Sequence, residues 1–346
     1  MPSSSRVAVR LRLEDAVALA FFLLTMGLRL FIKGFGSVTL SPADVLVIIP
    51  AMTFLLTKEF VHYFVMSARH ATERSSASLR SFIRPYWEIF RDWSPFLVIL
   101  LMYYSLWGDA THLLVTRDRD AELIEWDQRL FGCQASVALQ PFVTPPLTAW
   151  MELAYVFHIF NIPIVACFIY VWRSREHFRE MMSGVLVVTF FGLIGYLLVP
   201  AIGPLYTLRD QYTVPLRVPL EVVNRQIEFM DYARIKRDVF PSLHVGISFV
   251  VWLYAYRNSR RLFWILAPLV LSLFVSTVYL RYHYLVDVVA GLLLAPLCFF
   301  LANWLFLKFG EVRFTLALPE ALAQRTAGWG WFQPQAVVEE NPKERP

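Results

Sequence analysis

His283 and Asp287 are four residues apart in the segment from Arg281 to Asp287. On a helix this spacing places both side chains on one face, where they can hydrogen-bond. A carboxylate that holds one imidazole nitrogen leaves the other nitrogen free and basic, which is what a nucleophilic histidine requires. The same pair could instead be a buried polar contact that fixes the packing of two helices.

His244 offers a second imidazole, in the segment from Phe240 to Gly246. A phosphoryl transfer needs a proton for its leaving oxygen, and histidine titrates near neutral pH. Ser242 suits the N-cap of the helix that follows, whose first N–H groups would form an anion site. The simpler alternatives are an interfacial histidine and a serine that only caps its helix. Three other histidines near apolar stretches have no carboxylate four residues away, and we interpret them as structural: His62, His112 and His158.

The composition predicts the kind of protein that must position these residues. The chain has 346 residues, of which 57% are hydrophobic and only 17% are charged. A soluble domain of this length needs more charge to cover its surface, whereas here the apolar residues form stretches of about twenty, enough to cross roughly 30 Å of hydrocarbon. The net charge of +5 does not indicate nucleic-acid binding, and the three cysteines have no spacing typical of disulfide or metal sites. We therefore predict an integral membrane protein without a metal or other cofactor.

The hydropathy pattern predicts an all-α, polytopic membrane bundle. Residues 1–92 would be a two-span addition with a basic loop, residues 93–308 a six-helix catalytic core, and residues 309–346 a peripheral or disordered tail. Residues 118–131 mix acidic and apolar side chains and predict a short amphipathic helix at the interface. About eight spans are expected by length and apolarity, near residues 15–33, 43–66, 93–115, 148–172, 183–200, 242–257, 262–280 and 285–307.

Lys and Arg residues indicate the orientation, because they are enriched in cytoplasmic segments. With both termini inside, the inner segments hold roughly twice as many of them as the outer segments. This topology starts both histidine motifs at the extracytoplasmic or lumenal side of an inner or plasma membrane. Phosphoryl oxygens need cations around them, and the candidates in outer segments are Arg281, Arg209, Lys236 and Arg237. Each of these could instead be an interfacial anchor or a solvated loop charge.

Pro241-Ser242-x-His244, followed some forty residues later by His283-x-x-x-Asp287, resembles the type 2 phosphatidic acid phosphatase superfamily over roughly residues 120–305. The stretch from Pro200 to Tyr206, and leucine rather than glycine between Ser242 and His244, are more similar to its inositol phosphorylceramide synthase branch and bacterial relatives. The resemblance implies a covalent phosphohistidine at His283, oriented by Asp287. It further implies that His244 protonates the leaving group and that no metal takes part.

The sequence also departs from the family pattern. The family's first motif, a lysine followed seven residues later by Arg-Pro, is absent. An arginine precedes the nucleophilic histidine by six residues in the phosphatase branch, and Thr277 stands at that position here. Arg281 and Arg209 are the candidates to replace these cations.

Two classes of function follow from these observations. The first is an enzyme that opens a phosphoester of a membrane lipid phosphate at the outer face: a phosphatase if water attacks the intermediate, a phosphotransferase if a hydroxyl of inositol, a sugar or a lipid attacks it. The alternative is a transporter or structural membrane protein whose His-Asp pair relays protons. Against that alternative, no pair of interrupted helices in equivalent halves marks a midplane site.

Overall fold

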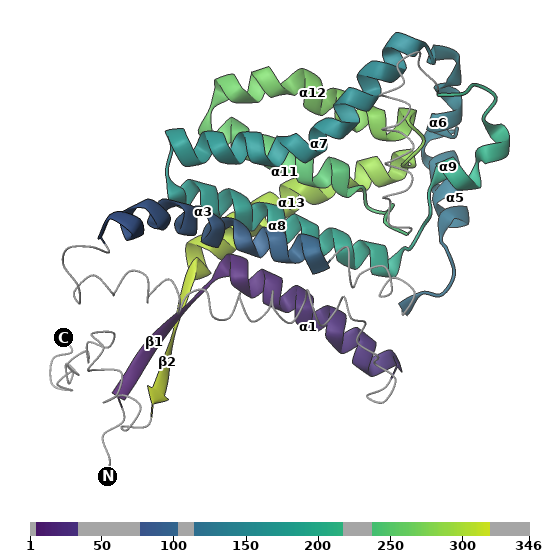
Figure 1. The fold of residues 1–346 in the computed structure, drawn as a ribbon. Coiled ribbons are helices and arrows are strands. Elements are labelled where there is room, and N and C mark those ends of the chain that lie inside the picture. Colours follow the sequence, from purple (N-terminus) through teal and green to yellow (C-terminus); the bar gives the residue numbers. More distant parts are fainter. Residues whose placement is uncertain (1–4, 34–76, 103–113, 217–236, 319–346) are drawn as a thin grey trace, which may run out of the picture.

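The computed structural model describes residues 5–33, 77–102, 114–216 and 237–318 of the chain (Figure 1). Long helices run alongside one another and form the body of the molecule, and short helices gather at one end of it. The described elements are β1 (Ser5–Arg12), α1 (Leu13–Lys33), α3 (Ala77–Met102), α5 (Asp120–Phe131), α6 (Ala135–Ala138), the 3-10 helix η4 (Gln140–Phe142), α7 (Pro145–Trp172), α8 (Arg175–Leu198), α9 (Pro204–Thr207), the 3-10 helix η5 (Arg209–Gln211), α11 (Leu243–Asn258), α12 (Arg260–Tyr279), α13 (Leu285–Phe309) and β2 (Glu311–Leu318).

Four of the described helices, α7, α8, α12 and α13, are long and apolar enough to cross a membrane. α11 has only 16 residues, fewer than the roughly 20 that span a bilayer without help. These five helices coincide with predicted spans, as does α1, and α5 is the predicted amphipathic helix. The predicted span at 43–66 and the end of that at 93–115 lie outside the described residues, so the total of eight spans stays a prediction.

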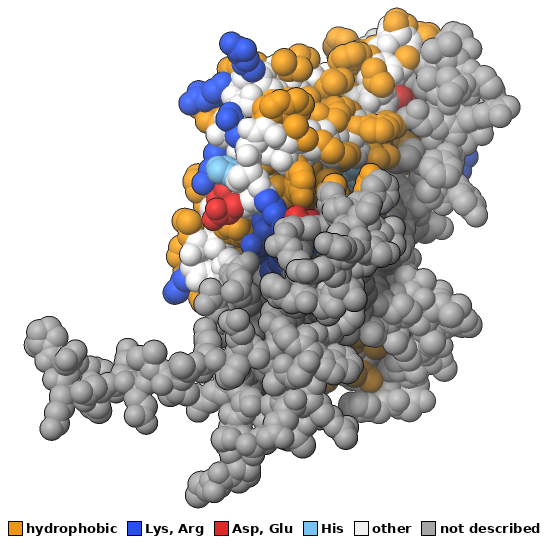
Figure 2. All heavy atoms as spheres, turned by 60° about the vertical axis from the view of Figure 1, so that its left-hand side comes forward, with side chains coloured by type: hydrophobic (Ala, Val, Ile, Leu, Met, Phe, Trp, Pro, Cys, Tyr) orange, Lys and Arg blue, Asp and Glu red, His pale blue; other side chains and the backbone are white. Residues whose placement is uncertain are grey.

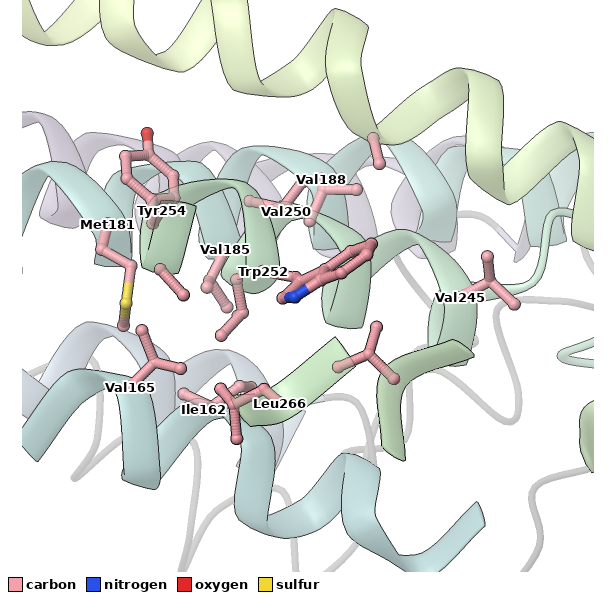
Figure 3. Close-up of a cluster of buried hydrophobic side chains, with 14 of the residues drawn as sticks. Ile162, Val165, Met181, Val185, Val188, Val245, Val250, Trp252, Tyr254 and Leu266 are labelled. Atoms are coloured by element: carbon pink, nitrogen blue, oxygen red, sulfur yellow. The ribbon is translucent and has the colours of Figure 1, made fainter. Parts of the chain in front are cut away.

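α11 is the centre of the bundle, because α7, α8, α12 and α13 all pack against it. Figure 3 shows the interior at this helix, where Val250 and Tyr254 lie among side chains of α7, α8 and α12. The Trp252 ring stacks on Phe263 of α12 at 4.2 Å between ring centroids. This packing is apolar on all sides of α11, which explains why its sequence shows no polar face.

The outward faces of the long helices are also apolar. Leu153 on α7, Ile265 on α12 and Leu297 and Phe300 on α13 are each more than half exposed. A soluble monomer does not expose this much contiguous apolar surface. The described helices therefore form a bundle that is apolar inside and outside, as an integral membrane protein requires.

Two strands extend the all-helical bundle, and they were not predicted. β1 and β2 pair antiparallel, with Val9 opposite Phe314 and Arg10 opposite Arg313. The signal was present in the sequence, because apolar residues alternate with polar or small ones through Ser5–Arg12 and again through Glu311–Leu318. The expectation of an all-α fold thus holds for the membrane helices and is wrong for these two flanking segments.

Ion pairs with buried carboxylates join the two-stranded sheet of β1 and β2 to the helical bundle. The Asp92 carboxylate accepts bonds from Arg12 at 2.8 Å and from Arg175 Nε at 2.6 Å, and Arg179 Nε donates to Glu14 at 2.7 Å. These pairs connect β1, α1, α3 and the start of α8. A buried charge without a partner would be strongly destabilising. The carboxylates of Asp92 and Glu14 therefore allow these arginines to lie at this end of an apolar bundle.

Gly291 allows α13 to approach the start of α11 closely. A Cβ atom at this position would fall 2.5 Å from the backbone oxygen of Ser242 and 3.2 Å from Val245 Cβ. Backbone cannot swing aside as a flexible side chain can. The close approach matters because Gly291 lies one turn after Asp287, so it sets the separation between the two histidine motifs.

We predict that Gly291→Ala pushes these two helices apart. Overpacking of this kind costs about 1–3 kcal/mol, and activity should fall further than stability because the motifs separate. Thermal unfolding in detergent and turnover of a phosphate ester would measure the two effects. Gly246→Ala is the matched control: its Cβ would meet only ordinary contacts at 3.4 Å and 3.7 Å, so it should change neither. Equal behaviour of the two variants would contradict the prediction.

Candidate active site

His244, His283 and Asp287 converge at one end of the bundle. His283 Nε2 lies 3.2 Å from His244 Nδ1, and His283 Nδ1 lies 3.5 Å from Asp287 Oδ2. His283 and Asp287 are almost completely buried. His244 and His283, which are 39 positions apart in the chain, thus form a continuous series with the Asp287 carboxylate. His283 faces His244 with Nε2 and Asp287 with Nδ1.

Tyr155 extends this series on the other side of His244. Its hydroxyl lies 3.0 Å from His244 Nε2, so both nitrogens of His244 have a partner. His158, one turn further along α7, packs edge-on against the His244 ring at 4.5 Å and bonds the backbone oxygen of Tyr155 through Nδ1 at 2.7 Å. His158 was predicted to be structural and Tyr155 was not predicted as a site residue; their spacing of three residues on α7 was the available signal.

The loop between α12 and α13 presents His283. The backbone N–H groups of Tyr282 and His283 both donate to the Thr277 oxygen at 3.0 Å, which closes the end of α12. Arg281 takes a left-handed conformation, with φ of 67°, and so reverses the chain between the two helices. Thr277, where the phosphatase branch of the family has an arginine, is therefore a buried helix-end residue rather than a cation.

α5 holds the first turn of α13 in place. The buried Asp127 carboxylate accepts the N–H groups of Leu285 at 3.0 Å and Val286 at 2.8 Å. These are N–H groups that a helix cannot satisfy within itself. Burial raises the pKa of Asp127 above its usual value, and the two N–H donors act in the opposite direction. α5 therefore supports the site, and its position at the membrane interface stays a prediction.

Asp120, at the other end of α5, holds the backbone at Ile202 and Gly203 and the side chain of Tyr284 in place. Its carboxylate accepts from the backbone N–H of Ile202 at 3.0 Å and Gly203 at 2.8 Å, and from the Tyr284 hydroxyl at 2.8 Å. Burial, together with the nearby Asp120 charge, raises the pKa of Tyr284, so this phenol stays protonated and donates. Asp120 and Asp127 are seven residues apart and share a face of α5, a pattern visible in the sequence but unused there.

Ser242 is the N-cap of α11, as predicted, and its hydroxyl accepts the N–H of Val245 at 3.5 Å. Its backbone N–H donates to the oxygen of Asp287 at 3.0 Å. This bond joins the two motifs through their backbones. It places the N-terminal end of α11, the end that favours anions, directly beside the first turn of α13.

The four candidate cations are distributed differently. Arg281 is buried; its guanidinium donates to the Val214 oxygen and lies 4.0 Å from the centre of the Tyr212 ring. Burial lowers the pKa of Arg281 from its ordinary value, which still leaves it charged at neutral pH. Arg209, on η5, is exposed. Lys236 lies outside the described residues.

Arg237 has a structural set of partners. It forms an ion pair with Asp118 at 2.6 Å and donates to the backbone oxygens of Val115 and Thr116 at 3.2 Å and 2.8 Å. Its left-handed φ of 76° turns the chain into the Phe240–Gly246 motif. These bonds fix the segment that leads into α11. Arg281 is left as the buried candidate cation, two residues before His283.

Within the described part of the chain, no group of three or more His, Cys, Asp or Glu side chains is arranged to hold a metal ion. The site instead offers a phenol and two imidazoles joined by hydrogen-bond contacts of 3.0 and 3.2 Å, with a carboxylate 3.5 Å from the second imidazole. Imidazole can serve as nucleophile and as acid, and a buried carboxylate stabilises the imidazolium that forms. The arrangement can therefore carry out nucleophilic catalysis with proton transfer.

We predict that Tyr155→Phe slows turnover without unfolding the protein. The change removes one hydroxyl and leaves His244 Nε2 without its partner, so the imidazole loses its fixed orientation; a loss of one such bond corresponds to roughly a tenfold decrease in kcat. Steady-state kinetics should show the decrease in kcat rather than in KM. Tyr206→Phe, at an exposed tyrosine of α9, is the control. A kcat equal to that of the wild type would show that Tyr155 only packs.

Comparison with known proteins agrees with this geometry. Neither a curated protein nor a solved structure matches the chain. A family model described as the PAP2 superfamily, a group of phosphatases and phosphotransferases, matches residues 121–301, more than half of the chain. The matched range contains α5 from its second residue onward, which includes Asp127, and all three residues of the His-His-Asp series. With a match of this extent over the helices that build the site, the chain belongs to the PAP2 superfamily.

Proposed function

We propose that the protein is a membrane enzyme that transfers or hydrolyses the phosphoryl group of a lipid phosphate through a phosphohistidine at His283. The observation that carries the proposal is the uninterrupted series from Asp287 through His283 and His244 to Tyr155, with contacts of 3.5, 3.2 and 3.0 Å. A packing contact between two helices needs only one such pair, whereas two-step phosphoryl transfer needs a nucleophile, an orienting acid and a proton donor.

In the first step His283 Nε2 attacks phosphorus, a P–N bond forms and the P–O bond to the lipid breaks. The leaving oxygen takes the proton from His244 Nδ1, the nitrogen that faces His283. His283 keeps its proton on Nδ1, beside Asp287, whose charge stabilises the cationic ring. In the second step an acceptor hydroxyl gives its proton to His244 and its oxygen attacks phosphorus. The P–N bond then breaks and His283 is restored.

The surroundings of the site support a lipid substrate and an extracytoplasmic or lumenal site. The series lies where α11 and α13 begin, and the end of an apolar helix is where a lipid headgroup phosphate would meet the protein. The bias of Lys and Arg toward the opposite segments favours an extracytoplasmic or lumenal site. Arg281 and the start of α11 would bind the phosphoryl oxygens. Residues 93–308 would be the six-helix catalytic core, and the likeness to the inositol phosphorylceramide synthase branch favours a hydroxyl acceptor over water.

Purified protein, incubated with a panel of radiolabelled lipid phosphates, tests the proposal. We expect released phosphate with water as acceptor, or a new labelled lipid when inositol, a sugar or a lipid alcohol is present, and the same rate after EDTA treatment. Acid-labile, base-stable label on the protein would identify the phosphohistidine. If no lipid in the panel reacts and no label appears on the protein, the proton-relay alternative becomes the better explanation.

A further inference from the structure

We propose that the end of the bundle away from His244 and His283 carries a binding site for the phosphate of an anionic membrane phospholipid. The site is a hollow of about 420 Å³ lined by Trp172, Arg173, Ser174, His177, Arg257 and Asn258. It lies where the turn from α7 to α8 meets the turn from α11 to α12. Since α11 runs from His244 to Asn258, the hollow is about 20 Å from the catalytic series.

The hollow is bounded by a rigid junction between the two turns. Arg173 donates through Nε to the backbone oxygen of Asn258 at 2.8 Å, and a second guanidinium nitrogen binds the same oxygen. Ser174 caps α8 by accepting the N–H of His177, and its hydroxyl also lies 2.7 Å from His177 Nδ1. Arg173, Ser174 and His177 are therefore held in place by bonds within the two turns.

The charge around the hollow is positive and incompletely neutralised. The bonds of Arg173 go to a neutral carbonyl, which satisfies donors without cancelling the charge. Arg257 pairs with Glu180 at 2.8 Å but keeps 44% of its side chain exposed. Arg260 lies over the Tyr256 ring at 3.9 Å, again a neutral partner. Arg175 and Arg179, by contrast, are committed to Asp92 and Glu14. Glu180 and Glu176, in the first turns of α8, are the nearby carboxylates, and the contacts of Arg173 and Arg260 to neutral groups leave positive charge that an anion can bind.

One exposed apolar residue, Trp172, lines the hollow, and others lie near the same ends of α7 and α12 in sequence. Val171 and Trp172 at the end of α7 are 67% and 66% exposed, and Trp264 and Ile265 on α12 are 68% and 70% exposed. Figure 2 shows this side of the molecule, with Lys, Arg and a histidine at the edge of a broad hydrophobic surface. A phospholipid has the matching arrangement of groups, with a charged phosphate next to apolar chains. A soluble phosphate compound would leave the apolar residues uncovered, so we assign the hollow to a lipid.

Thermal unfolding of the purified full-length protein in a neutral detergent tests this site. Short-chain phosphatidylglycerol should raise the midpoint saturably, whereas phosphatidylcholine of the same chain length and free glycerol phosphate should not. Arg173→Gln should weaken the apparent affinity for phosphatidylglycerol roughly tenfold or more, as expected for the loss of a charge-assisted contact. Arg257→Gln, which leaves the bond to Asn258 intact, should weaken it as well. It also provides a reading if Arg173→Gln does not fold.

Arg261→Gln is the matched control, because Arg261 is exposed on the same basic turn but does not line the hollow. It should bind phosphatidylglycerol with the affinity of the wild type. The proposal is overturned if Arg261→Gln weakens binding as much as the two lining variants, since attraction would then be diffuse. Wild-type affinity in both lining variants, or equal affinity for free glycerol phosphate, would also overturn it.

Discussion

Turnover of a lipid phosphate falls by on the order of 10⁴ or more in His283→Ala, and no phosphorylated protein accumulates. The reason is that His283 supplies the atom that bonds to phosphorus, so no neighbouring group can take over a partial share of its role. His244 is the nearest alternative nucleophile, but its Nε2 is directed to Tyr155 and its Nδ1 to the position that His283 would vacate. Measurement of product formation together with label retained on the protein checks both parts of the prediction.

His177→Ala is the matched control for His283→Ala, because it removes an imidazole at the other end of the bundle. It should retain wild-type turnover. The prediction is contradicted if His283→Ala still yields acid-labile label. The prediction is also contradicted if turnover by His283→Ala stays within tenfold of the wild type while the thermal unfolding of this variant is unchanged. His283→Gln distinguishes a loss of chemistry from a loss of fold. It keeps a polar side chain of similar length and should be as inactive as His283→Ala.

The sequence predicted the parts of the site that depend on local geometry. The capping role of Ser242 follows from the unsatisfied N–H groups of a first turn. The nearness of His283 to Asp287 was predicted from helical spacing, but the structure gives another reason: His283 precedes Tyr284, the N-cap of α13, so the two side chains meet at the start of this helix rather than on one face of it. The meeting of His244 with His283 is a different kind of inference. It required both motifs to begin spans on the same membrane side, and the alternation of spans supplied that condition.

Residues that reach the site from other elements could not be predicted in the same way. Tyr155 and His158 lie on α7, and only the rotation of α7 about its axis decides whether they face His244 or the lipid. Asp127 holds α13 from α5, a helix whose amphipathic pattern indicates an interface but does not identify the neighbour on its polar face. Contacts of this kind are set by packing between helices, about which periodicity within one helix carries no information.

The basic residues illustrate the same limit in loops. Arg281 and Arg237 both take left-handed backbone conformations, which direct their side chains in ways that spacing along a helix or strand does not describe. Arg281 contacts Tyr212 and Val214, in a segment that Gln140 holds through the N–H groups of Thr213 and Val214. The position of one candidate phosphate-binding cation thus depends on a loop that is itself fixed by a third segment.

His244→Ala gives an effect that depends on the leaving group. With a lipid phosphate the departing alkoxide is strongly basic and needs a proton, so the first step should slow by about 10²–10⁴. p-Nitrophenyl phosphate releases a weakly basic phenolate that leaves without protonation, so His283 should still be phosphorylated. The second step, however, requires His244 to accept a proton from water. We therefore expect a burst of one nitrophenol per enzyme molecule followed by slow turnover, with the label trapped on His283.

Rapid-mixing kinetics measures the burst. The double variant His244→Ala/His283→Ala should abolish it, because the phosphoryl group is trapped on His283. Tyr155→Phe should show a smaller version of the same dependence on the leaving group, since it disturbs the orientation of His244 without removing its imidazole. If His244→Ala slows the lipid phosphate and p-nitrophenyl phosphate equally and gives no burst, His244 acts before the ester bond breaks. Its contact of 3.2 Å with His283 would then serve to orient the nucleophile rather than to deliver a proton.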